Sequence, residues 1–110
     1  MNGRVSNYLL SMGFIPNKIG YKYLVDLIGM GLTGADILPL SKNGYVVLAK
    51  KYGKSASTVE KDIQNAVSAA WLKGDVDTLN GEFGSTIDMR KGKPSNKHFI
   101  LTAIEKLRNN

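Results

Sequence analysis

Apolar side chains recur at helical spacing from the start of the chain. Between residues 4 and 12 the apolar positions fall on one face, and Gly13 follows as a stop signal. Residues 17–30 form a second such pattern, although Gly20 and Gly29 weaken it. The sequence therefore predicts two helices, whose inward faces are Val5, Tyr8, Leu9 and Met12 in the first and Ile19, Tyr23, Leu24, Leu27 and Ile28 in the second.

Two more helices are predicted on either side of Gly53. Residues 31–40 contain Gly, Thr, Asp and Pro39, which predict a loop, and Ser41 is a candidate N-cap for a helix over 41–52. Residues 56–72 have the clearest apolar stripe of the chain, and Lys73 with Gly74 is a typical helix end. The inward positions are Tyr45, Val46, Leu48, Ala49 and Tyr52 in one helix and Val59, Ile63, Ala66, Val67, Ala70 and Trp71 in the other.

The rest of the chain predicts a brief helix, a loop and a last helix. Residues 75–83 begin with the cap residues Asp75 and Asp77, and residues 84–94 are expected to form a loop. Ser95 or Asn96 can cap a final helix whose buried face is Phe99, Ile100, Ala103, Ile104 and Leu107. The pattern therefore predicts an all-α fold of about six helices, with residues 1–110 as a single domain.

Composition narrows the possible functions. The 110 residues include 15 Lys or Arg against 9 Asp or Glu, a formal charge of +6 that favours acidic partners such as nucleic acid or an anionic membrane surface. Without cysteine, disulfides, thiol nucleophiles and Cys-based metal sites are excluded. The apolar runs fall short of the roughly 20 residues of a membrane helix, and the N-terminus lacks the features of a signal peptide. A cytoplasmic protein without a membrane partner is expected.

The third and fourth predicted helices are separated only by residues 53–55. Two helices joined by such a turn, often containing Gly, are typical of a helix-turn-helix, whose second helix enters the DNA major groove. If the apolar stripe of the second helix faces the core, a polar face that includes Ser57 and Ser68 points away from it. On that face, side chains able to hydrogen-bond with base edges are predicted to read DNA: Thr58, Glu60, Lys61, Gln64 and Asn65.

The same polar face has an ordinary alternative explanation. Any solvated helix presents Lys, Gln, Asn and Glu to water, so the pattern alone does not choose DNA. Ser57 and Glu60 also have the spacing of a capping box, in which Glu60 reaches back to a backbone N–H. Glu60 can therefore be structural, functional or both.

A basic segment precedes the last predicted helix. Residues 90–98 carry four Lys or Arg side chains and no acid, and a loop that leads into a helix N-terminus can bind a DNA phosphate. A solvated basic loop is the alternative. The predicted phosphate-binding residues are Lys54, Ser55, Ser57, Arg90, Lys91, Lys93, Ser95 and Lys97.

Little in the sequence favours catalysis. His98 is the only histidine, so a His-based metal site or catalytic dyad is not expected. We expect the His98 side chain to lie at the surface or to be half-buried. No phosphate-binding glycine loop or paired-carboxylate motif accompanies the acids Asp75, Asp77, Glu82 and Asp88. We expect no enzyme activity, no metal and no cofactor.

Four blocks, in this order and spacing, carry a family resemblance: IGYKYLVDLIGM, LAKKYGKSASTVEKDIQNAVSAAW, KGDVDTLNGEFG and KGKPSNKHFILTAIEKLR. From about Val5 to Arg108 the chain resembles the C-terminal effector domain of the stage-zero sporulation response regulator of endospore-forming Firmicutes. The resemblance implies a six-helix domain that binds a short promoter box through a helix-turn-helix, often as tandem copies in contact on the DNA.

The chain departs from that family's pattern at the reading positions. The family core S-x-V-E-R-x-I-R addresses bases through its Glu and two Arg, whereas this chain has Glu60, Lys61 and Gln64 there, with Asp62 adding an anion. Arg and Lys are not equivalent at a bidentate site, so a different DNA box is expected. The chain also begins within a few residues of the region that resembles the family, which favours a stand-alone regulator without the family's receiver domain. An excised fragment of a longer protein is the alternative.

The sequence as a whole predicts a sequence-specific double-stranded DNA-binding protein that regulates transcription, with tandem or homodimeric contacts on DNA as a possibility. One alternative is a plasmid or phage protein that acts at an origin or transfer site. Another is a protein–protein module that antagonises the full-length regulator.

Overall fold

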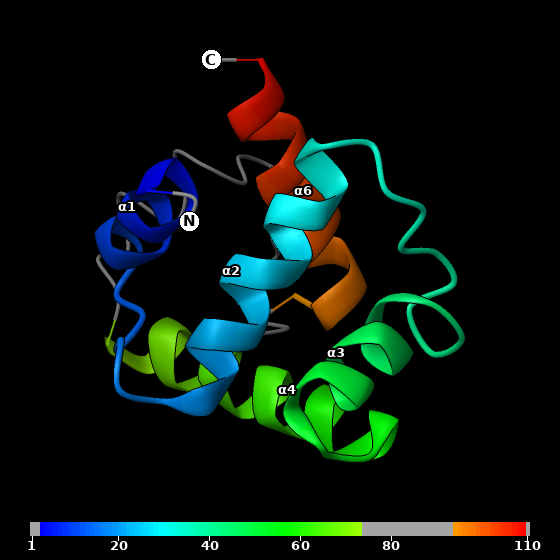
Figure 1. The fold of residues 1–110 in the computed structure, drawn as a ribbon. Helices are drawn as coiled ribbons and strands as arrows, with labels where there is room; N and C mark the ends of the chain where they lie inside the picture. The colour runs from blue at the N-terminus through cyan, green and yellow to red at the C-terminus, as the bar shows by residue number, and fades with distance from the viewer. Residues whose placement is uncertain (1–2, 74–93, 110) are drawn as a thin grey trace.

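The computed structural model describes residues 3–73 and 94–109, which form helices without any strand (Figure 1). This confirms the predicted all-α fold. The predicted helix at 75–83 and most of the loop at 84–94 lie outside the described residues. The helices are α1 (Gly3–Ser11), α2 (Ile19–Leu32), α3 (Gly44–Tyr52), α4 (Ala56–Lys73) and α6 (Asn96–Arg108).

Helix α2 is the centre of the described fold, and it packs against α1, α3, α4 and α6 (Figure 1). Two of its glycines allow this close packing. A Cβ atom at Gly20 would lie 2.3 Å from the Asp62 carbonyl oxygen of α4, and one at Gly31 would lie 2.3 Å from Cδ1 of Ile104 in α6. Glycine in a helix costs conformational entropy, but here it lets neighbouring helices approach α2.

The core lies where α2, α4 and α6 meet. Every described helix contributes buried residues from its predicted apolar stripe, although the predicted inward residues Ile19 of α2 and Val46 of α3 are exposed and half-buried, respectively. The largest side chains that are fully buried include Tyr23 and Phe99. Phe99 packs against Phe14 and, edge to face, against the half-buried Trp71, with ring centroids 5.2 and 6.0 Å away. The stripes of α1, α4 and α6 therefore face inward as the periodicity predicts.

Several predicted boundaries and caps are wrong. Helix α2 begins at Ile19 and runs on to Leu32, and Ile19 is 40% exposed because it lies at the first position of the helix. Helix α3 begins only at Gly44, so Ser41 is not its N-cap. Residues 39–43 form a turn instead, in which the Pro39 carbonyl accepts hydrogen bonds from the backbone N–H groups of residues 42 and 43.

Two arginines tie the ends of helices together. Arg4 of α1 donates to the Leu107 carbonyl near the end of α6, and Arg108 donates to the Gly31 carbonyl near the end of α2 at 2.9 Å. Cationic donors are favourable there because the last carbonyls of a helix have no partner within the regular helix and carry partial negative charge. Within residues 3–73 and 94–109, each helix is too short or too polar to cross a membrane.

Candidate nucleic-acid interface

The predicted helix-turn-helix is present and consists of α3, residues 53–55 and α4. Gly53 ends α3 in the left-handed conformation, with φ 68° and ψ 37°, and its N–H and that of Lys54 both bond to the Ala49 carbonyl. A left-handed glycine at the end of a helix lets the chain leave the helix axis without steric strain, because glycine has no Cβ atom. This turn places the start of α4 directly after the end of α3.

Helix α4 docks through its apolar stripe. Val59, Ile63 and Val67 are fully buried, and the helix packs most extensively against α2 and α3. Asp62 is half-buried on the flank that faces α2. Burial raises the pKa of Tyr23 in α2, and the nearby charge of Asp62 raises it further. The anion at position 62 therefore lies beside α2 rather than at the centre of the solvent face.

Ser55, rather than Ser57, caps α4. The Ser55 Oγ accepts a hydrogen bond from the Thr58 backbone N–H at 3.1 Å, and the Val59 N–H bonds to the Ser55 carbonyl at 3.1 Å. The predicted capping box of Ser57 and Glu60 is therefore wrong, because the helix begins earlier than that box requires. The Ser55 hydroxyl also lies 2.9 Å from the Thr58 Oγ1 and 3.2 Å from the Ser57 Oγ.

The side chains predicted to read bases all lie on the exposed face of α4. We call this set the recognition face: Thr58, Glu60, Lys61, Gln64 and Asn65. Of the other outward positions, Ser57 is exposed, and Ser68 is half-buried with its hydroxyl bonded to the Gln64 carbonyl at 2.9 Å. The alternative explanation of Glu60 as a capping residue falls away with the capping box, and its carboxylate remains on the exposed face.

The first turn of α6 lies beside one flank of the recognition face. Ser95 caps α6 by accepting from the His98 backbone N–H at 3.1 Å, as predicted for one of its two candidate caps. The other candidate, Asn96, donates instead to the Glu60 carbonyl at 3.1 Å and to the Tyr45 Oη at 3.3 Å. Residues 60 and 96 are far apart in the sequence, so periodicity did not predict this contact.

A hollow of about 390 Å³ marks this meeting point. It brings together four of the predicted site residues, Glu60, Gln64, Ser95 and Lys97. Its remaining lining residues, which the sequence did not single out as site residues, are Leu40, Ser41, Tyr45, Pro94 and Asn96.

The other predicted site residues have different positions. Lys54, Ser55 and Ser57 are exposed at the start of α4, and Thr58, Lys61 and Asn65 lie on the part of the recognition face outside the hollow. The basic residues Arg90, Lys91 and Lys93 lie outside the described part of the chain.

Tyr45 forms the buried wall of the hollow and is only 3% exposed. Burial raises the pKa of its phenol, the hydrogen bond from Asn96 lowers it, and the nearby charge of Glu60 raises it. The net shift is upward, so Tyr45 stays neutral and its oxygen remains an acceptor for Asn96. The hollow therefore has a neutral, buried wall at Tyr45 and charged side chains, Glu60 and Lys97, among its other lining residues.

These features describe a helix-turn-helix whose second helix has an exposed polar face, with a capped helix start beside it. A family model described as "Sporulation initiation factor Spo0A C terminal" matches residues 5–107. The chain belongs to the Spo0A C-terminal family. That family comprises DNA-binding effector domains that regulate transcription in sporulation.

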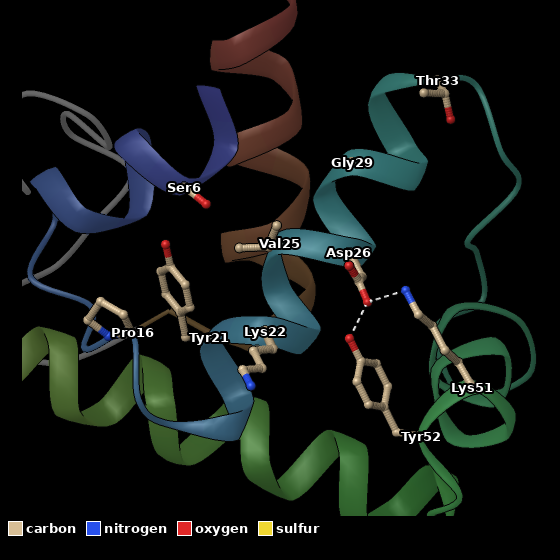
Figure 2. Close-up of a pocket in the computed structure, with 10 residues that line it drawn as sticks. All are labelled: Ser6, Pro16, Tyr21, Lys22, Val25, Asp26, Gly29, Thr33, Lys51 and Tyr52. Carbon is tan, nitrogen blue, oxygen red and sulfur yellow. Dashed lines mark hydrogen bonds and ion pairs between the residues drawn. The ribbon is translucent and has the colours of Figure 1, made fainter. Parts of the chain in front are cut away.

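This Spo0A C-terminal domain also has a larger hollow, of about 810 Å³, between α1, α2 and α3 (Figure 2). On its wall, the Asp26 carboxylate accepts from Lys51 Nζ at 2.9 Å and from Tyr52 Oη at 2.5 Å (Figure 2). These bonds tie α3 to α2. The predicted site residues are not among those that line this hollow in the described part of the chain, so its polar groups hold the helix-turn-helix in place rather than extend the recognition face.

Proposed function

We propose that this domain binds double-stranded DNA in a sequence-specific manner, with the first half of α4 in the major groove, and that it regulates transcription. The observation that carries the proposal is the juxtaposition of the exposed recognition face with the capped start of α6. A helix-turn-helix reads bases through the N-terminal half of its second helix, while neighbouring helix starts and basic side chains hold the backbone phosphates.

The chemistry of the recognition face suits base edges. Lys61 can donate to the guanine acceptors, whereas Gln64 and Asn65 can each pair with adenine through two hydrogen bonds. Glu60 can accept from the cytosine amino group, and Thr58 can contact either a polar edge or the thymine methyl group. All five side chains are exposed, so they can reach a groove without disturbing the core.

The phosphate contacts are assigned to two places. At the start of α4, Lys54 is exposed beside the serines Ser55 and Ser57. At the start of α6, the Ser95 oxygen accepts from the backbone, its hydroxyl hydrogen can be donated to a phosphate, and Lys97 adds a positive charge. The sequence adds Arg90, Lys91 and Lys93, which precede α6.

The DNA sequence that this domain prefers should differ from that of its relatives with arginines at the reading positions. Lys61 has a compact point charge and Gln64 has none, whereas arginine forms a planar fork that binds guanine through two bonds. Gln64 in particular changes the preferred base from guanine towards adenine. We therefore propose a recognition box of its own for this domain.

The test is selection of bound sequences from a pool of random DNA duplexes, followed by titration of the selected duplex and of random DNA at two salt concentrations. We expect one short enriched box, tighter binding to it than to random DNA, and weaker binding to both at higher salt. Tandem or homodimeric contacts would appear as two boxes at fixed spacing.

Failure of this test has a clear meaning. Binding that is absent or insensitive to salt would refute the proposal and favour a protein–protein module that antagonises a full-length regulator. An enriched box gives the DNA sequence with which a promoter can be distinguished from a plasmid or phage origin or transfer site.

A further inference from the structure

Asn96 connects three helices through one amide group. It is the first residue of α6, and its Nδ2 donates to the Glu60 main-chain carbonyl of α4 at 3.1 Å and to the Tyr45 Oη of α3 at 3.3 Å. An amide NH₂ group has two hydrogens, so both donors of Asn96 are used. The Glu60 carbonyl can accept this bond in addition to its helical bond because a carbonyl has two lone pairs.

The division of work between Ser95 and Asn96 makes this contact possible. Because Ser95 supplies the cap of α6, the Asn96 side chain is not needed for capping and can reach α4. Helices α4 and α6 contact each other far less than each contacts α2. A direct polar link between the start of α6 and the first half of α4 therefore constrains an arrangement that apolar packing constrains only weakly.

We propose that Asn96, with Tyr45 as its buried anchor, is a positioning residue for DNA reading. It holds the start of α6 at a fixed offset from the recognition face, so that a phosphate bound at Ser95 and Lys97 and the bases opposite Lys61 and Gln64 are engaged at the same time. Its amide hydrogens are already used within the protein, so its role is exerted through the two helices and not through the DNA. This inference rests on the proposed function.

The main test compares Asn96→Ala with wild type by the ratio of the Kd for random DNA to the Kd for the selected box. Since a positioning role couples the two kinds of contact, we expect this ratio to fall about five- to tenfold, the size expected for the loss of one or two hydrogen bonds. Asn109→Ala is the matched control, because Asn109 is exposed at the opposite end of the same helix. It should keep the wild-type ratio.

Two further variants separate positioning from folding. Asn96→Asp has nearly the same shape and places a favourable negative charge at a helix start, but it lacks the amide hydrogens. It should stay folded and show the reduced ratio. Tyr45→Phe removes only the anchoring hydroxyl inside the protein, so we expect a loss of about two- to fivefold, and no further loss when it is added to Asn96→Ala.

The binding ratios of these variants decide whether Asn96 is a positioning residue. Folded Asn96→Ala, Asn96→Asp and Tyr45→Phe variants that discriminate as well as wild type would overturn the positioning role and leave the proposed function intact. An equal fold-change for Asn109→Ala would overturn it as well. A wild-type domain that binds no DNA would overturn both proposals together.

Discussion

The backbone at Gly20 in α2 packs directly on the backbone at Asp62 in α4. A Cβ atom at position 20 would lie 2.3 Å from the Asp62 carbonyl oxygen and 2.8 Å from the Ala66 Cβ. Both obstacles belong to the backbone or to its first side-chain atom, so neither can rotate away. The close approach of α4 to α2 therefore depends on the absence of a side chain at Gly20.

Gly20→Ala should destabilise the fold. Forcing extra atoms into a packed helix crossing costs about 1–3 kcal/mol, which outweighs the gain of roughly 0.5–1 kcal/mol from replacing glycine by alanine in a helix. Urea unfolding followed by circular dichroism measures the change. Gly3→Ala is the control, because nothing lies within 4 Å of a Cβ there. A Gly20→Ala variant as stable as Gly3→Ala would show that α2 and α4 can separate without cost.

Ser55 and Ser57 offer a matched pair for the start of α4. Ser55→Ala should reduce the free energy of unfolding by about 1 kcal/mol, because the Thr58 N–H loses its side-chain partner. Ser57→Ala should change it by less than about 0.5 kcal/mol, since Ser57 is exposed within the first turn. Thermal unfolding of both variants in the same buffer tests the difference. The reverse order would restore the capping box of Ser57 and Glu60.

The helices and their inward faces were predictable where the signal is local. The stripe of Val59, Ile63 and Val67 repeats within a single helix, and all three are buried as expected. Caps were predictable only in part, because several polar residues compete near each helix start. Ser95 is a cap as expected, but Ser41 lies in a turn and Ser55 takes the place expected for Ser57.

Contacts between distant residues could not be predicted from periodicity. From the sequence alone, Gly20 and Gly31 only lower the helix propensity of their segment. Their role becomes clear from the close approach of Asp62 and Ile104 in the structure. The same holds for the hollow at the recognition face, since nothing near Asn96 in the sequence indicates that it meets Glu60. The exposure of the recognition face was predictable, because it is the complement of a clear apolar stripe.

The hydrogen bond between Tyr52 and Asp26 makes the free energy of unfolding depend on pH in the alkaline range. The hydrogen bond to Asp26, together with burial, raises the pKa of Tyr52 from 10.0 to about 12. A raised pKa means that the folded state favours the neutral phenol, so the stabilisation is complete below pH 10 and is lost as the pH rises through 12. Tyr52→Phe should cost about 1–2 kcal/mol at pH 7, and its deficit relative to wild type should shrink between pH 10 and 12.

Urea unfolding of both proteins across that pH range provides the test. The aromatic ring of Tyr52 packs edge to face on Tyr23, with ring centroids 5.0 Å apart, and a phenylalanine ring can keep this packing. The comparison therefore measures the contribution of the Tyr52 hydroxyl alone. Lys51→Ala is the control at pH 7, because its ion pair with Asp26 is 59% exposed on the lysine side and should contribute less than about 1 kcal/mol. A deficit for Tyr52→Phe that stays constant from pH 8 to 12 would contradict the assigned role of the bond.

Lys61 and Lys97 carry the same charge, yet the proposed interface gives them different tasks. Lys61→Ala, like Gln64→Ala, should relax preference at one base pair of the selected box and cost about 1–3 kcal/mol on that box. Lys97→Ala should weaken binding to all duplexes alike and reduce the slope of log K against log salt by about one unit, because one phosphate contact is lost. Competition titrations against single-base variants of the box, repeated at several salt concentrations, separate the two effects.

The matched control is Lys106→Ala, because Lys106 is an exposed lysine in the last turn of α6, and it should leave both the base preference and the salt slope unchanged. Equal losses on cognate and random DNA for Lys61→Ala and Lys97→Ala would refute the division between base reading on α4 and phosphate binding at the start of α6.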